Sequence, residues 1–151
     1  MSGAAQTFGI LAVDDNEDDI VIIRRTFARA RLANKVNYVR SGEEALAYLR
    51  HTGAYAETQP PCPGLILLDI AMPRMSGFQV LEQLKADPRL KKIPVVMLTT
   101  SDREEDIVRS YEGGACSYIT KPVGFEAFAK VIEHFELYWT LVSKVPGSGG
   151  A

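Results

Sequence analysis

Short apolar runs alternate along the chain with segments in which apolar residues recur every three or four positions. This alternation is typical of β-α units, in which the strands of a parallel sheet are connected by helices. Two of the runs are almost wholly apolar, as expected of strands that helices cover on both faces. The expected strands are residues 8–14, 35–39, 65–69, 94–98 and 117–120.

Helices are expected in the four gaps between these strands and after the last one. Asn16 is a candidate N-cap for the first helix, and Ser41 with Glu44 three residues later has the spacing of a capping box for the second. Ser76 precedes the third helix, and the fourth covers about residues 103–112. The pattern therefore predicts an α/β fold, a flavodoxin-like, doubly wound, five-stranded parallel sheet with five helices.

The last expected helix, residues 124–143, has a wider apolar surface than a core-facing helix needs. Its apolar positions extend over about two thirds of the circumference at helical spacing. Either the end of the helix folds back over the sheet, or this surface is a protein–protein interface. The interface residues would be Phe135, Tyr138, Trp139 and Leu141.

Length and composition indicate one globular domain. The chain has 151 residues, of which 46% are hydrophobic and 24% charged, and we expect a domain at 8–145 with flexible tails at 1–7 and 146–151. The net charge of −2 and the lack of a basic run argue against nucleic acid as a partner. No apolar stretch reaches the ~18 residues of a membrane span, and no signal peptide is evident. A cytoplasmic location is therefore expected.

Polar residues follow four of the predicted strands at their carboxyl ends. Asp14 and Asp15 end the first strand, Asp69 the third, Thr99 follows the fourth and Lys121 the fifth. In a doubly wound sheet these ends meet at one edge, so the side chains are expected to converge. Three neighbouring carboxylates repel one another and need a counter-charge, which a hard, oxygen-liganded ion such as Mg2+ provides. A carboxylate beside such an ion, with a lysine and a hydroxyl nearby, indicates a phosphoacceptor site.

Each of these residues also has an ordinary structural interpretation. Asp14 and Asp15 could cap the first helix, Asp69 could be a turn residue, and Lys121 could be a solvated loop charge. Their joint occurrence at the ends of four strands favours the functional interpretation over these separate ones.

Four segments of the chain, LAVDDNEDD, LILLDIAMPRMSGFQVL, IPVVMLTTS and SYITKPV, carry these residues. In these segments the sequence resembles the receiver domain of response regulators in two-component signalling. The resemblance implies that a histidine kinase phosphorylates Asp69 and that Asp15 and Asp69 bind Mg2+ with the backbone carbonyl of Ala71. It also implies that Asp14 supports the metal site.

The resemblance further implies a conformational switch. Thr99 and Lys121 would contact the phosphoryl oxygens, and Tyr118 would turn inward when Thr99 is drawn to the phosphoryl group. The bond between Lys121 and Pro122 matches one that the family usually holds in cis. Such a protein is not an enzyme acting on other substrates, because it promotes only its own phosphorylation and dephosphorylation.

Within the family, the sequence is most similar to the single-domain receivers that partner bacterial phytochromes. The features that carry this likeness are the long segment before the third strand (53–64), the stretch 84–95 and the aromatic-rich last helix. The likeness implies a phytochrome-linked, light-regulated histidine kinase as the partner and a homodimer as the assembly.

Three alternatives to the phosphoacceptor function belong to other functional classes: a cofactor carrier, an enzyme and a docking module. A flavodoxin-like FMN carrier needs a hydroxyl- and glycine-rich phosphate loop after the first strand, where the segment Asp14-Asp15-Asn16-Glu17 would repel phosphate. An aspartyl phosphatase would have a second aspartate two positions after its nucleophile, but Asn16 stands two positions after Asp14. The third alternative is a docking module of the same fold that acts without phosphorylation.

Overall fold

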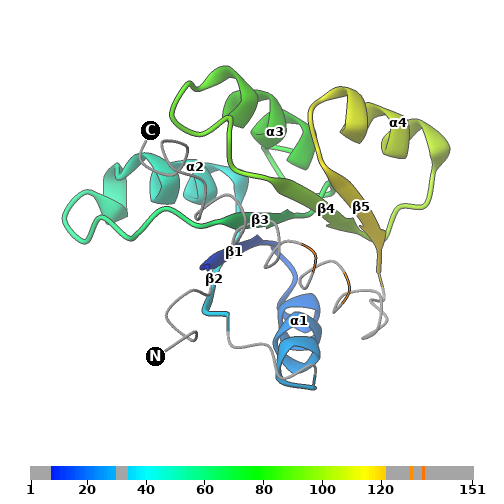
Figure 1. Ribbon diagram of the computed structural model, residues 1–151, viewed down its shortest axis with the longest axis horizontal. Coiled ribbons are helices and arrows are strands. Elements are labelled where there is room, and N and C mark those ends of the chain that lie inside the picture. The colour runs from blue at the N-terminus through cyan, green and yellow to red at the C-terminus, as the bar shows by residue number, and fades with distance from the viewer. Residues whose placement is uncertain (1–7, 30–33, 122–129, 131–133, 135–151) are drawn as a thin grey trace.

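The computed structural model describes residues 8–29, 34–121, 130 and 134. Within them the chain forms a five-stranded, wholly parallel sheet in the order β2-β1-β3-β4-β5 (Figure 1). The elements are β1 (Ile10–Val13), α1 (Glu17–Arg29), β2 (Val36–Val39), α2 (Gly42–Arg50), the 3-10 helix η2 (Gly53–Tyr55), β3 (Leu65–Leu68), α3 (Gly77–Ala86), β4 (Val95–Thr99), α4 (Glu104–Glu112) and β5 (Ser117–Thr120).

This strand order confirms the predicted fold class. The chain moves outward from β1 to β2, returns to β3 on the other side of β1, and continues outward through β4 and β5. Four of the five predicted helices are α1 to α4. The fifth prediction, residues 124–143, lies outside the described residues apart from Lys130 and His134, which are both helical. No helix among the described residues is long and apolar enough to cross a membrane.

Helices lie on both faces of the sheet and produce two cores. Figure 1 shows α2, α3 and α4 on one face and α1 on the other. Successive residues of β1 point to opposite faces of the sheet. Leu11 and Val13 pack in the core between the sheet and helices α2 and α3, whereas Ile10 and Ala12 pack in the core between the sheet and α1. The central strands are therefore apolar throughout, as expected of strands buried on both faces.

The helix starts largely follow the predicted capping residues. Ser76 and Gln79 form a complete capping box at α3, in which each side chain accepts a hydrogen bond from the other residue's backbone N–H. At α2 the box is only half formed: the hydroxyl of Ser41 accepts from the backbone N–H of Glu44, but the Glu44 carboxylate accepts from the N–H of Arg40.

The strand ends fix where the polar residues lie. Strands β1 and β3 each end one residue earlier than predicted, at Val13 and Leu68, and these two residues are register partners. Asp14 and Asp69 come directly after them, so they leave the sheet side by side at its carboxyl edge. The strand order reverses at the same pair of strands, which is where doubly wound proteins place their functional crevice.

Candidate functional site

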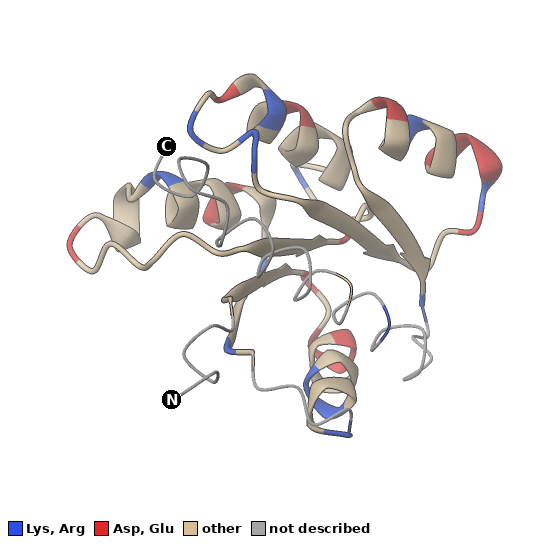
Figure 2. Cartoon of the chain, viewed as in Figure 1, with Lys and Arg blue, Asp and Glu red and all other residues tan. Residues whose placement is uncertain are grey.

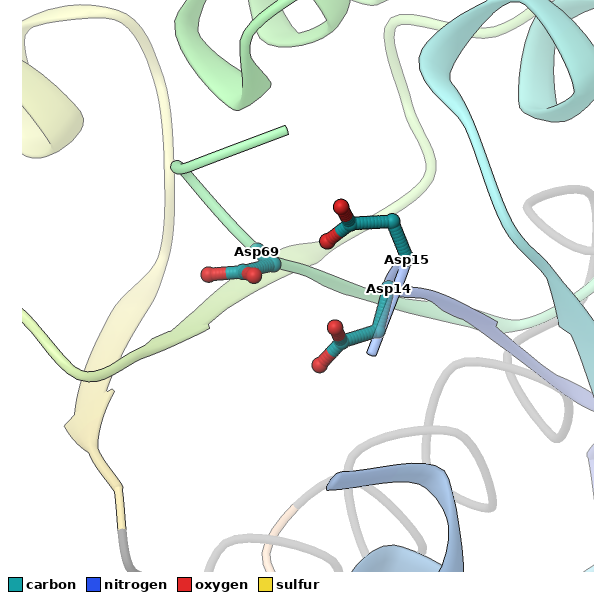
Figure 3. A group of neighbouring side chains, drawn as sticks. All are labelled: Asp14, Asp15 and Asp69. Carbon is teal, nitrogen blue, oxygen red and sulfur yellow. The ribbon is translucent and has the colours of Figure 1, made fainter. Parts of the chain in front are cut away.

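Three carboxylates gather at the carboxyl ends of β1 and β3. One oxygen from each of Asp14, Asp15 and Asp69 lies within 4.8 Å of the others (Figure 3). Asp14 and Asp69 are buried, at 2% and 7% exposure, and Asp15 is exposed. Burial raises the pKa of Asp14, and the hydrogen bond from Lys121 opposes this rise. The site thus joins two buried acids to one that faces solvent.

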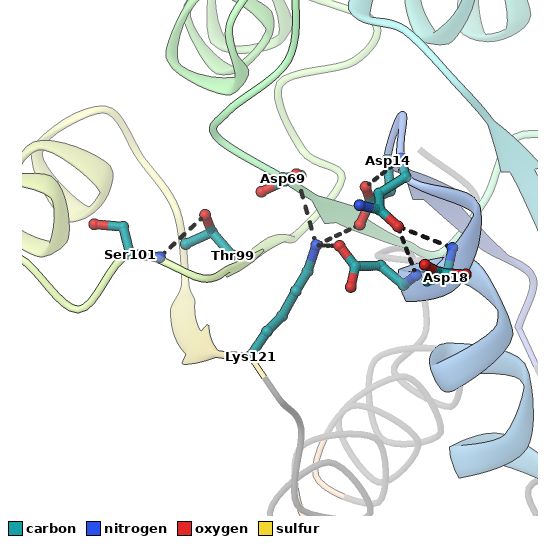
Figure 4. A network of polar contacts seen from close by, with 8 residues as sticks. Asp14, Asp18, Asp69, Thr99, Ser101 and Lys121 are labelled. Carbon is teal, nitrogen blue, oxygen red and sulfur yellow. Dashed lines mark hydrogen bonds and ion pairs between the residues drawn. The ribbon is translucent and has the colours of Figure 1, made fainter.

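Lys121 brings a cation into this group of acids from the end of β5. Its Nζ lies 2.5 Å from Asp14 Oδ2, 2.8 Å from Asp19 Oδ2 and 3.6 Å from Asp69 Oδ2 (Figure 4). Burial alone would lower the pKa of Lys121, but the hydrogen bonds to Asp14 and Asp19 and the charge of Asp69 outweigh burial and raise it. The lysine is therefore a fixed positive charge at neutral pH.

The charges of the site favour a bound divalent cation. The ammonium of Lys121 pairs with Asp14, Asp19 and Asp69, and Asp15 adds a fourth carboxylate to the group, so negative charge remains in excess. Beyond Asp19, the first turn of α1 carries Glu17 and Asp18, and the first turn of α4 is also acidic, as Figure 2 shows at both helix starts. Carboxylate oxygens with an exposed side are the donor set that Mg2+ prefers, so these residues fit the predicted ion.

The β4–α4 connection forms a second hydrogen-bonded group beside the acids. Thr99 is buried at the end of β4, and the N–H of Ser101 donates to its Oγ1 at 3.5 Å (Figure 4). The Tyr118 hydroxyl donates to the Ser101 carbonyl at 2.8 Å, and the Ser101 hydroxyl donates to Asp106 at 2.7 Å. A movement of the Thr99 side chain would therefore affect Tyr118 and α4 through Ser101.

Of the remaining predicted site residues, Ala71 is among the described residues. Ala71 lies exposed in the loop after β3, two residues beyond Asp69. The predicted cis bond to Pro122 and the predicted dimer-interface residues lie outside the described residues. Those interface residues are Phe135, Tyr138, Trp139 and Leu141.

Sequence reasoning missed two residues that shape the site. Asp19, in the first turn of α1, holds the Lys121 ammonium. Gly77, the first residue of α3, lies so close to the end of β3 that a Cβ there would be 2.1 Å from the backbone oxygen of Asp69. Its N–H also donates to the Ile70 carbonyl at 2.9 Å. The signal for the glycine was its place in the segment LILLDIAMPRMSGFQVL, eight residues after Asp69.

A wholly parallel sheet thus brings together, at one edge, three neighbouring carboxylates, two of them buried, and a buried lysine. The model of the response regulator receiver domain matches residues 10–133, and the chain belongs to that family. Receiver-domain response regulators are signalling proteins of two-component systems.

Two proteins of similar sequence support the assignment to the receiver family. The chain is 37% identical over 145 residues to a probable methanogenesis regulatory protein, FilR2, of Methanothrix harundinacea, covering 95% of this chain and 91% of the relative. It is 34% identical over 139 residues to the response regulator Rcp1 of Synechocystis sp., covering 92% and 93%.

Two solved structures are similar in fold and in sequence. The phosphorylated cyanobacterial phytochrome response regulator RcpA has a TM-score of 0.74 and 39% identity, covering 93% of this chain and 99% of that one. The Mn2+-bound form of Rcp1 has a TM-score of 0.73 and 34% identity over the same shares. The predicted membership of the receiver family, and the likeness to phytochrome response regulators, are thus confirmed.

Proposed function

We propose that the protein is a single-domain response regulator that accepts a phosphoryl group on Asp69 from a histidine kinase in a Mg2+-dependent reaction. The observation that carries the proposal is the position of Asp69. Its carboxylate is buried beside the acids that would bind the ion and lies 3.6 Å from the Lys121 ammonium. A carboxylate in this setting can act as a nucleophile, because a bound ion and the lysine would both neutralise the negative charge of the phosphorylated product.

In the proposed reaction, a carboxylate oxygen of Asp69 attacks the phosphorus of the kinase phosphohistidine. The new P–O bond forms as the P–N bond breaks, and the departing imidazole nitrogen keeps the electron pair and takes up a proton. Mg2+, held by Asp14, Asp15, Asp69 and the carbonyl of Ala71, would neutralise charge on the transferring group. Lys121 and Thr99 would contact the phosphoryl oxygens, so the chain itself promotes the transfer and the later hydrolysis.

The output is proposed to be a conformational switch. Phosphorylation adds roughly −1.5 to −2 charges and new acceptor oxygens beside Thr99. A Thr99 hydroxyl that turns toward these oxygens would no longer accept a hydrogen bond from the Ser101 N–H. Because the Tyr118 hydroxyl donates to the carbonyl of Ser101, a movement of Ser101 would also move Tyr118. The connection to α4 would shift with them, and the signal would pass through protein contacts on this surface.

The proposed partner is a phytochrome-linked histidine kinase in the cytoplasm. The similarity to RcpA supports this partner, because RcpA is a cyanobacterial phytochrome response regulator and is matched over 99% of its chain. A homodimer through Phe135, Tyr138, Trp139 and Leu141 of the last predicted helix is part of the same proposal and rests on the sequence pattern.

Intact mass after incubation with acetyl phosphate and Mg2+ tests the phosphoacceptor. We expect the wild type to gain one phosphoryl group and the Asp69→Asn variant to gain none, and the gain to be lost when a chelator removes Mg2+. Circular dichroism of both proteins controls for folding. If the folded wild type stays unmodified, the phosphorylation-independent docking module is the better description.

A further inference from the structure

The ammonium of Lys121 is held by an acid that does not belong to the carboxylate triad. Asp19 Oδ2 lies 2.8 Å from Lys121 Nζ, whereas Asp69 Oδ2 lies 3.6 Å away, beyond hydrogen-bond distance. In the described state the lysine is therefore bonded to Asp14 and Asp19 and only electrostatically attracted to Asp69.

Asp19 is fixed in place by the start of α1. Its own N–H and that of Asp18 both donate to the side-chain oxygen of Asn16, which caps the helix. The Asp19 carboxylate is 21% exposed on the side of the site nearest α1. Because the helix start is tied down in this way, the carboxylate stays within reach of Lys121 without rearrangement of the backbone.

The two acids that hold Lys121 differ in their relation to the metal. Asp14 belongs to the triad that would bind Mg2+, so a bound ion would compete with the lysine for its carboxylate. Asp19 is not a member of that triad. When the metal is bound, Asp19 is thus the acid left to compete for the ammonium with a phosphoryl group on Asp69.

We propose that Asp19 is a positioning residue that holds Lys121 back from Asp69 and so weakens the contact between the lysine and the phosphoryl group. An ammonium has three N–H donors, and a charge-assisted bond to a carboxylate occupies one of them. The inference rests on the proposed function of Asp69 as phosphoacceptor. Its consequence is that Asp19 lowers the population of the phosphorylated, switched state.

Beryllium trifluoride with Mg2+ mimics a phosphoryl group on an aspartate and measures this competition directly. We expect Asp19→Asn to bind beryllium trifluoride about fivefold more tightly than the wild type, the effect of weakening one partly exposed charge-assisted hydrogen bond. Asp18→Asn is the matched control, because Asp18 is exposed in the same helical turn and its change removes the same charge. That control is expected to bind like the wild type.

A double-mutant cycle separates the effect of the Asp19–Lys121 hydrogen bond from a general effect of the Asp19 charge. In a Lys121→Met background there is no ammonium to hold back, so Asp19→Asn is expected to have no further effect on beryllium trifluoride affinity. An equal gain in both backgrounds would overturn the proposal, since the gain would then come from the field of Asp19 alone.

NMR of the Lys121 ammonium provides a readout that needs neither metal nor phosphoryl mimic. The wild type and Asp18→Asn are expected to show a slowly exchanging ammonium signal, and Asp19→Asn a markedly faster exchange. Unchanged exchange in Asp19→Asn, or unchanged affinity while the wild type binds beryllium trifluoride, would refute the role of Asp19. A folded wild type that binds no beryllium trifluoride would instead refute the proposed function of Asp69.

Discussion

The ammonium of Lys121 lies 2.5 Å from a carboxylate oxygen of Asp14, although 107 positions separate the two residues in the sequence. Strand β5 delivers the lysine and β1 the aspartate, and both side chains are nearly excluded from solvent. A buried ion pair thereby joins the outer strand β5 to the interior strand β1, across β4 and β3. Breaking such a pair leaves one uncompensated charge in the interior, which costs more than the pair itself contributes.

Lys121→Ala is expected to reduce the free energy of unfolding without metal by about 3 kcal/mol, because Asp14 is left buried and unpaired. Mg2+ should recover part of this loss, since the triad Asp14, Asp15 and Asp69 remains intact. Phosphorylation-dependent partner binding should be lost, because no cation then meets the phosphoryl group. Urea unfolding with and without Mg2+ measures the first two effects. Lys92→Ala, at an exposed position, is the control, and an equal loss in both variants would contradict the prediction.

Asp15→Asn is expected to weaken Mg2+ binding by on the order of tenfold to a hundredfold while leaving stability nearly unchanged. Asp15 is the exposed member of the triad, so its change removes a ligand charge without unpairing a buried group. Isothermal titration calorimetry gives the affinity and thermal unfolding the stability. Asp18→Asn, a nearby exposed acid outside the triad, should bind Mg2+ like the wild type. Equal affinities of the two variants would show that Asp15 is no ligand.

The sequence was sufficient to place residues whose position follows from strand ends. Asp14, Asp69 and Lys121 each follow a strand of a parallel sheet, so their convergence required only the strand order. Asp19 could not be placed in this way, because its contact depends on how α1 is rotated and how closely it packs on the sheet. Capping roles had a similar limit: Glu44 has the right spacing for a capping box, but its carboxylate accepts from the Tyr55 hydroxyl, which η2 brings back to α2.

Gly77→Ala is expected to destabilise the fold by about 3 kcal/mol or more and to abolish phosphorylation of Asp69. A Cβ at this position would meet the Asp69 backbone oxygen at 2.1 Å and the Ile70 Cα at 2.8 Å, and backbone atoms cannot move aside as a flexible side chain can. Urea unfolding and intact mass with acetyl phosphate measure the two effects. Gly9→Ala is the control, since the nearest atom to a Cβ there is 4.0 Å away. Wild-type phosphorylation in a stable Gly77→Ala protein would rule out the close packing.

The Tyr55–Glu44 hydrogen bond is expected to make stability depend on pH in the alkaline range. Donation to the Glu44 carboxylate raises the pKa of Tyr55 from 10.0 to about 12. Because the folded-state value is the higher one, the bond stabilises the protein fully below the unfolded value, and the stabilisation is lost as the pH rises through about 12. Tyr55→Phe should therefore be less stable than the wild type at neutral pH, and the difference should shrink steadily across this range. Urea unfolding at a series of pH values, with the exposed Tyr111→Phe as control for the loss of one phenol, measures it. A difference between wild type and Tyr55→Phe that stays constant across the range would mean that the phenol does not donate to Glu44 in solution.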